Sequence, residues 1–238
     1  MTHQSAPGTE GKTLKSLILP LLSSFIPGVI ALGVVLFLPA WTLNYWQAWV
    51  FILVFMVLIT LTGLYFSVKD PASMERRKQA GLGAEQSTGQ KIMITFAYFS
   101  LLGVGVFSGL DRRFGWSKMP AYVCILGMGL VVLANVIWFY VQKENTFVGA
   151  TVRIFEGQKV ISTGPYAIIR HPKYVGDLVF IIGIPLALGS WWGLLVLVLT
   201  IPGLAWRILD EEKLLKKDLP GYVEYTQKVP YRLAPHLW

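Results

Sequence analysis

The chain has 238 residues, of which 54% are hydrophobic and only 14% are charged, and its mean hydropathy is +0.56. In soluble domains about a quarter of the residues are charged, so this composition excludes an ordinary soluble enzyme and indicates an integral membrane protein. The formal net charge of +8 comes from basic residues scattered among loops between apolar segments. This scatter excludes the clustered basic surface of a nucleic-acid-binding protein.

A structural zinc site and a disulfide bond within the chain are also excluded by the residues present. Cys124 is the single cysteine, so no disulfide forms within the chain. The three histidines, His3, His171 and His236, lack the spacing of a metal-binding motif. We therefore expect no metal among the cofactors.

Apolar segments dominate the chain from residue 17 to residue 206. Four of them have about the ~20 residues that cross the hydrocarbon core of a bilayer, at 17–41, 46–68, 92–110 and 121–141. The last stretch, 175–206, is too long for one ordinary span, and Pro185, Gly189 and Ser190 interrupt it near its middle. It is either a helical hairpin or one long broken helix, because broken helices are tolerated where they line a protein cavity.

These segments predict an all-α fold, a polytopic membrane helix bundle of about five transmembrane segments. We divide the chain into a polar N-terminal tail at 1–14, an N-terminal transmembrane bundle of four helices at 15–142, and a C-terminal module at 143–238 that includes the last membrane helices. The length suits one compact bundle without a separate soluble domain.

Charge predicts the orientation of the bundle. The segments 69–91 and 143–173 are basic, whereas the link 42–45 carries no charge. By the positive-inside rule both basic segments face the cytoplasm, together with the two ends of the chain. The segment 111–118 opposes this assignment, because its three basic residues then lie on the outer side.

The segment 164–176 combines two prolines and two glycines with charged and aromatic residues. Proline fixes φ and glycine permits conformations that other residues avoid, so the backbone is tightly defined. One interpretation is a rigid frame that grips a polar ligand at the membrane edge; the other is a basic loop attracted to anionic lipid head groups. We favour the ligand site, because simple attraction does not need a rigid backbone. Before it, 152–154 and 158–161 alternate as in a short extended segment.

A second candidate is the pair Arg207 and Glu211, which are four residues apart and share a helix face. As an exposed ion pair they would contribute only a few tenths of a kcal/mol. Arg207 follows an apolar run directly, however, and so lies at the membrane boundary, where ionisable residues are often functional. Its planar guanidinium suits a carboxylate or a phosphate. The tyrosines at 222–225 and the segment 229–233, which we expect to be extended, are compatible with either a site or an interfacial aromatic belt.

Together these motifs resemble the isoprenylcysteine carboxyl methyltransferase family, which is grouped with the membrane phospholipid methyltransferases. The resemblance rests on 164–166, 170–176, Arg207 with Glu211, 222–225 and 229–230. It implies a helical membrane bundle whose cytoplasmic C-terminal half binds S-adenosyl-L-methionine without a Rossmann domain. Arg207 and Glu211 would then be catalytic, and the cofactor-binding residues would be Gln158, Lys159, Val160, Ile161, Tyr166, Arg170, His171, Pro172, Lys173, Tyr174 and Glu211.

The resemblance further implies a methyl acceptor that is lipophilic or small and is delivered through the membrane. The carboxylate of an isoprenylcysteine-like molecule is one candidate, and a phospholipid amine, a thiol or another lipid acid are others. Methyl transfer is an in-line displacement that needs alignment and a dry pocket more than a strong base. Arg207 would orient the acceptor.

Two other classes of protein remain open. The motifs at 170–177, 210–213 and 229–232 are also similar to the C-terminal motifs of membrane sterol reductases, which use NADPH, and Asp177 fits that pattern. A membrane scaffold without activity is the third class. It leaves the pair Arg207–Glu211 and the rigid segment without an explanation.

Overall fold

The computed structural model describes residues 14–78, 88–149, 154 and 157–238. All regular structure in these ranges is helical. In chain order the elements are α1 (Leu14–Ala40), α2 (Trp46–Lys69), α3 (Pro71–Lys78), α4 (Thr88–Phe114), α5 (Ala121–Glu144), the 3₁₀ turn η2 (Gly164–Ala167), α6 (Pro172–Ala187), the 3₁₀ turn η3 (Trp192–Leu195), α7 (Val196–Asp218) and α8 (Tyr222–Lys228).

Four of the described helical segments are long and apolar enough to cross a membrane: Trp46–Lys69, Gly89–Phe114, Ala121–Glu144 and Trp192–Asp218. A shorter apolar helix, Phe25–Ala40, precedes them. The predicted all-α, polytopic membrane bundle is confirmed, and the chain is an integral membrane protein. The predicted tail lies outside the described residues up to residue 13.

The last apolar stretch forms a hairpin, so the first of the two predicted alternatives is correct. The chain reverses after α6 at Gly189, whose φ of +77° lies in the left-handed region that glycine adopts without a steric penalty. The Ser190 amide then donates to the Pro185 carbonyl (2.8 Å), and the Ser190 hydroxyl donates to the buried Asp111 carboxylate (2.5 Å). The turn is thereby attached to the end of α4.

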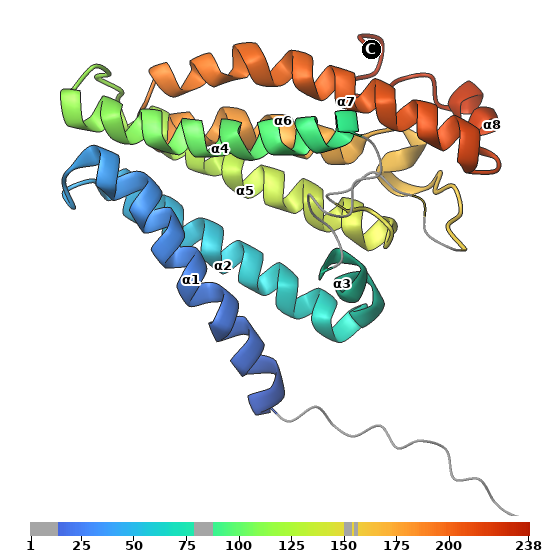
Figure 1. Cartoon of the computed structure of the whole chain (residues 1–238), viewed down its shortest axis with the longest axis horizontal. Coiled ribbons are helices and arrows are strands. Elements are labelled where there is room, and N and C mark those ends of the chain that lie inside the picture. The colour runs from blue at the N-terminus through green and yellow to red at the C-terminus, as the bar shows by residue number, and fades with distance from the viewer. Residues whose placement is uncertain (1–13, 79–87, 150–153, 155–156) are drawn as a thin grey trace, which may run out of the picture.

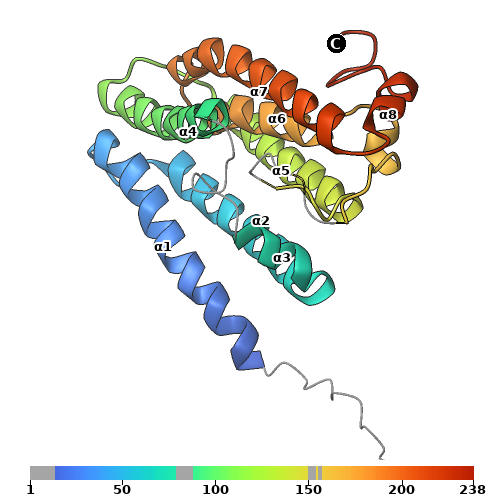
Figure 2. The ribbon, with the colours of Figure 1, turned by 45° about the vertical axis from the view of Figure 1, so that its right-hand side comes forward.

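Helices α4, α5, α6 and α7 run roughly along one direction, whereas α1 and α2 slope away from them, and the connections between helices gather at two ends (Figures 1 and 2). At one end lie α3, the segment after α5, and α8. At the other end lie the links 41–45, 115–120 and 188–191, which contact one another: the Tyr45 hydroxyl donates to the Leu188 carbonyl (2.6 Å). Alternate links thus lie at opposite ends, as the predicted topology requires.

The segment 111–118, with its three basic residues, lies at the end opposite to α3 and α8. Two of these residues contact partners there. Arg112 donates to the Asn44 carbonyl (2.8 Å), and the Arg113 guanidinium lies over the rings of Trp41 (5.3 Å) and Phe114 (5.4 Å). Cation–π contacts stabilise such charges. The two arginines therefore have a structural role at this end, which the positive-inside rule does not consider when it counts the charges of loops.

Helices α5 and α6 pack closely because glycines form their contact. A Cβ built on Gly127 would lie 2.2 Å from the Ala187 backbone nitrogen, and one on Gly183 would lie 3.1 Å from the Val131 nitrogen. Small residues allow membrane helices to approach at backbone distance. Trp138 and Phe180 pack beside this contact, with ring centroids 4.8 Å apart.

We predict that Gly127→Ala separates α5 from α6 and lowers the thermal unfolding midpoint of the purified protein, because overpacking costs about 1–3 kcal/mol. Gly129→Ala is the matched control on the same helix. A Cβ at Gly129 meets nothing within 4 Å, so alanine there gains about 1 kcal/mol of helix propensity. Equal shifts for the two variants would contradict the glycine contact.

Candidate active site

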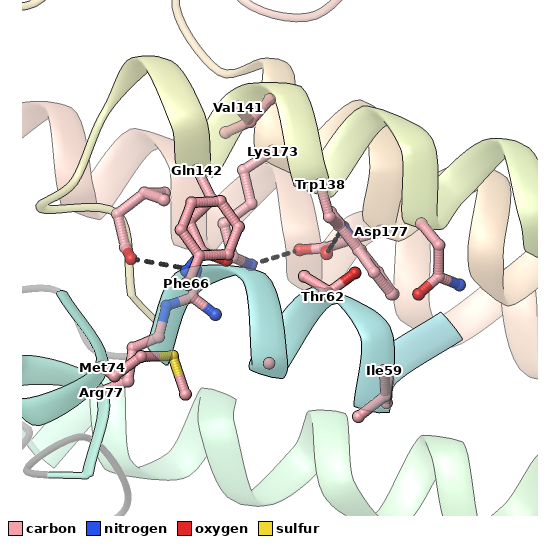
Figure 3. A pocket seen from close by; sticks show the side chains of 13 residues that line it. Ile59, Thr62, Phe66, Met74, Arg77, Trp138, Val141, Gln142, Lys173 and Asp177 are labelled. Atoms are coloured by element: carbon pink, nitrogen blue, oxygen red, sulfur yellow. Dashed lines mark hydrogen bonds and ion pairs between the residues drawn. The ribbon is translucent and has the colours of Figure 1, made fainter. Parts of the chain in front are cut away.

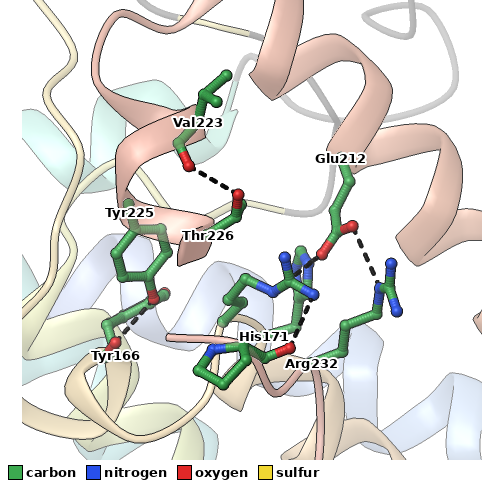
Figure 4. Close-up of polar contacts among 9 residues, drawn as sticks. Tyr166, His171, Glu212, Val223, Tyr225, Thr226 and Arg232 are labelled. Atoms are coloured by element: carbon green, nitrogen blue, oxygen red, sulfur yellow. Dashed lines mark hydrogen bonds and ion pairs between the residues drawn. The ribbon is translucent and has the colours of Figure 1, made fainter. Parts of the chain in front are cut away.

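One buried carboxylate joins two arginines and a histidine at the α8 end of the bundle. Glu212, on α7, is 3% exposed. Its Oε1 lies 3.2 Å from both the His171 Nε2 and the Arg170 Nε, and its Oε2 accepts from the Arg232 Nε (3.2 Å). Figure 4 shows Glu212 reaching from α7 toward His171 and Arg232. We call these four residues the Glu212 cluster.

Backbone hydrogen bonds hold the same segments together. The Arg170 amide donates to the Tyr231 carbonyl (2.9 Å), and the His171 amide donates to the Arg232 carbonyl (3.0 Å). The segment after α8 therefore lies along the residues that precede α6. Pro172 occupies the first turn of α6, where its missing N–H costs nothing.

Tyr174 links the two residues predicted to be catalytic. Its hydroxyl donates to Glu211 Oε2 (2.6 Å) and accepts from Arg207 Nε (3.2 Å). Tyr174 and Arg207 are buried, whereas Glu211 is half-buried. The shared helix face of Arg207 and Glu211 is observed, and a tyrosine from α6 connects their side chains.

A mainly apolar cavity of about 310 Å³ ends at this bridge. It lies between α4, α6 and α7, and Tyr174 and Arg207 line it together with apolar residues such as Ile94, Leu101 and Leu204. The ring of Tyr174 therefore faces an apolar space while its hydroxyl binds two charged groups. We call this space the α4–α7 cavity.

The region around Tyr166 contains a second set of polar contacts. The Tyr225 hydroxyl donates to the Tyr166 carbonyl (2.7 Å), as Figure 4 shows, and the Asn145 amide donates to the Tyr166 hydroxyl (3.3 Å). Burial raises the pKa of Tyr166 well above its ordinary value and the pKa of Tyr225 to about 12. Both hydroxyls are therefore protonated at neutral pH; in these contacts the Tyr225 hydroxyl donates and the Tyr166 hydroxyl accepts.

The remaining predicted site residues lie in different surroundings. Val160 packs against the apolar side of α8, near Tyr222 and Tyr225, whereas Lys159 is exposed. Residues 158–161 have no regular secondary structure. Most of the other half of the expected extended segment, 152–153, lies outside the described residues. Lys173 donates to Asp177 (2.7 Å) and lines the α4–α7 cavity.

One buried hydroxyl in this region points to a ligand with polar groups. Tyr222 is 4% exposed, and its hydroxyl has no hydrogen-bond partner among the described residues. Burial, followed by the charges of Glu212 and Glu211, raises its pKa, so the hydroxyl is protonated and lies near both carboxylates. Leaving such a group unsatisfied costs about 1–3 kcal/mol.

Sequence reasoning missed Glu212 and Arg232. A signal for Glu212 was present, since it is four residues after Ile208 and shares a helix face with it. Ile208 is fully buried. A carboxylate on a buried face needs cationic partners, and the basic residues at 170, 171 and 232 were available. Nothing in the local pattern around Arg232 indicates its partner.

We predict that Glu212→Gln strongly destabilises the protein, because it leaves the buried Arg170 and the partly buried Arg232 without their counter-charge. Breaking a buried ion pair costs about 3–5 kcal/mol, which chemical unfolding in detergent would measure. Glu224→Gln, at an exposed position of α8, is the matched control and should change the free energy of unfolding by less than about 0.5 kcal/mol. A Glu212→Gln variant as stable as this control would contradict the role of the cluster.

Comparison with known proteins places these residues in a family context. Residues 122–219 match the family model "Phospholipid methyltransferase". The match begins in α5 and ends directly after α7, so it includes Tyr166, the start of α6, the bridge residues and Glu212.

Two curated proteins are similar to larger parts of the chain. Delta(14)-sterol reductase TM7SF2 of Mus musculus is 28% identical over 127 residues, which cover 46% of this chain and 30% of the reductase. Cobalt-zinc-cadmium resistance protein CzcN of Cupriavidus metallidurans is 28% identical over 177 residues, 71% of this chain and 73% of that protein. The chain thus spans less than a third of the length of the sterol reductase that it matches.

Both resemblances suggested by the motifs are confirmed by these matches. The segment from α5 to the end of α7 carries the sequence pattern of the phospholipid methyltransferase family, and Arg207, Glu211 and Glu212 lie within it.

Proposed function

We propose that the protein is an integral membrane methyltransferase that uses S-adenosyl-L-methionine and methylates a lipophilic acceptor. The observation that carries this proposal is the Arg207–Tyr174–Glu211 bridge at the end of an apolar cavity. The family match over the same residues supports the reaction class. The division at residue 143 into a membrane bundle and a catalytic module is part of the proposal.

The residues present fit the cofactor. Glu211 offers a half-buried carboxylate to a cationic group, and Tyr222 offers a buried hydroxyl to a polar one. Val160 packs near Tyr222, and the Tyr174 hydroxyl donates to Glu211. The Tyr225 hydroxyl, on the same helix as Tyr222, donates to the Tyr166 carbonyl. We therefore assign residues 158–161, Tyr166 and 170–174 to the cofactor site. When bound, S-adenosyl-L-methionine supplies a methyl group on an activated sulfonium.

Arg207 is the residue that we assign to the acceptor. It is buried at the polar end of the α4–α7 cavity, and its guanidinium can align a carboxylate with two parallel hydrogen bonds. A carboxylate is already nucleophilic, so the residues need only orient it and exclude water. A lipid acid, such as an isoprenylcysteine-like carboxylate, is therefore the acceptor that we favour over an amine or a thiol.

The end of the bundle that holds the Glu212 cluster would face the cytoplasm. Helix α3, with Arg76, Arg77 and Lys78, lies at this end, as do the basic residues of 170–173 at the start of α6, and basic segments are retained on the cytoplasmic side. The cofactor would then reach Glu211 from water, while the acceptor would reach Arg207 from the bilayer.

An NADPH-dependent reductase is the second candidate. The specific observation in its favour is Asp177, which the sequence shares with the sterol reductase pattern and which the Trp138 Nε1 (2.9 Å) and the Lys173 Nζ (2.7 Å) hold in place. The similarity to a sterol reductase supports it. The shared motifs therefore describe a cofactor site that two chemistries can use.

Binding of S-adenosyl-L-methionine, S-adenosylhomocysteine and NADPH to the purified protein in detergent separates the two candidates. We expect calorimetry to detect binding of the two adenosyl compounds and none of NADPH. Binding of NADPH alone would replace the methyltransferase with the reductase.

We predict that His171→Ala weakens S-adenosylhomocysteine binding by at least tenfold, because it removes a partner of Glu212 beside the proposed cofactor site. His236→Ala is the matched control, since the exposed His236 contacts Tyr231 outside the cluster. A folded His171→Ala variant with unchanged affinity would remove His171 from the site.

We predict that Arg207→Ala lowers kcat/KM for a lipid acid by more than 100-fold while S-adenosylhomocysteine affinity changes less than threefold. Loss of charge-assisted hydrogen bonds worth about 3 kcal/mol accounts for this size of effect. Arg207→Lys keeps the charge without the planar fork and should recover only part of the activity. A loss of cofactor affinity equal to the loss of turnover would show that Arg207 binds the cofactor instead.

A further inference from the structure

A second cavity, of about 390 Å³, lies on the other side of the α5–α6 pair. Helices α2, α3 and α5 and the start of α6 line it, and of the residues assigned above to the cofactor site Lys173 alone lies in its wall. Its walls include Phe66, Val141 and Trp138, and Figure 3 shows these side chains around it. We call it the α2–α5 cavity.

Polar groups lie at one part of this cavity. Arg77 from α3, Gln142 from α5 and Lys173 from α6 line it. Figure 3 shows Arg77 beside Phe66, with one of its hydrogen bonds drawn; its Nη2 donates to the Val148 carbonyl (3.5 Å). Two cations and one anion, Asp177, therefore line the space, and positive charge is in excess.

The cavity lies beside the C-terminal ends of two helices of membrane-spanning length. Its apolar walls come from α2 and α5, both long and apolar enough to cross a membrane. Arg77 lies on α3, which begins two residues after the last residue of α2, Lys69. Apolar surface from membrane helices beside cations at a helix end is the arrangement that binds the acyl chain and the phosphate of one amphiphile.

The two cavities share a wall. Trp138, Lys173 and Asp177 line both of them, and Figure 3 shows Trp138 and Lys173 directed at the Asp177 carboxylate. A phosphate near Lys173 would compete with Asp177 for the ammonium group. Occupation of the α2–α5 cavity would thereby act on a side chain that also faces the α4–α7 cavity.

We propose that the α2–α5 cavity binds one anionic phospholipid, with its phosphate at Arg77 and Lys173 and an acyl chain along Phe66 and Val141. The inference concerns binding alone and is measured without turnover, so its failure leaves the proposed methyltransferase function untouched.

Gly63 provides a direct test, because it lines this cavity and a Cβ there meets nothing within 4 Å. Gly63→Leu should fill the space without disturbing the fold. Gly103→Leu is the matched control: a Cβ at Gly103 also meets nothing within 4 Å, and Gly103 lies on α4, away from this cavity. A second pair is Arg77→Gln with Lys69→Gln, since Lys69 is exposed, carries the same charge and does not line the cavity.

The delipidated full-length protein would be titrated with phosphatidylglycerol, phosphatidylcholine and glycerol 3-phosphate, with bound lipid counted by native mass spectrometry. We expect one phosphatidylglycerol to bind at least tenfold more tightly than phosphatidylcholine, and no binding of glycerol 3-phosphate. Gly63→Leu should abolish this site and Arg77→Gln should remove the preference, while both controls bind as the wild type does.

Three results would overturn the proposal. They are equal binding of the two phospholipids, binding of glycerol 3-phosphate as tight as that of phosphatidylglycerol, and a folded Gly63→Leu variant that keeps the wild-type affinity for phosphatidylglycerol. The first rejects the role of charge, the second rejects a lipid as the ligand, and the third rejects this cavity as the place of binding.

Discussion

The charge of Glu212 constrains the whole α8 end of the molecule. A carboxylate that is 3% exposed is very unfavourable unless cations and donors surround it. Its partners come from the residues before α6 and from the segment after α8. These parts of the chain must therefore meet on α7 for the protein to fold, and the start of α6, which carries Tyr174, is positioned by the same requirement.

Tyr174 then separates two environments. Tyr174 lines the apolar α4–α7 cavity, and its hydroxyl forms hydrogen bonds with Glu211 and Arg207 on α7. Tyrosine suits such a boundary because it has an apolar body and a polar tip. In the proposed reaction, a lipid acceptor and a polar cofactor would meet at this hydroxyl.

Local sequence pattern predicted what depends on local properties. Hydropathy located most of the membrane helices, Gly189 and Pro185 indicated a break in the last apolar stretch, and helical spacing placed Arg207 and Glu211 on one face. It missed what tertiary contacts decide. Helix α4 extends over Thr88–Phe114 rather than 92–110, because its polar ends contact other elements: Gln90 donates to Asp210, and Asp111 accepts from Ser190. Glu212 was missed for the same reason, since its partners are 20 to 42 residues away along the chain.

Gly176, the second glycine of the segment 164–176, shows how the two cavities depend on one helix contact. A Cβ at Gly176 would lie 2.6 Å from the Trp138 Nε1, so any side chain there would displace the indole that binds Asp177. The indole forms part of the wall between the cavities. Close packing of α5 on α6 is therefore a condition for two separate cavities. A change that widens this contact would act on the α4–α7 cavity and on the α2–α5 cavity together.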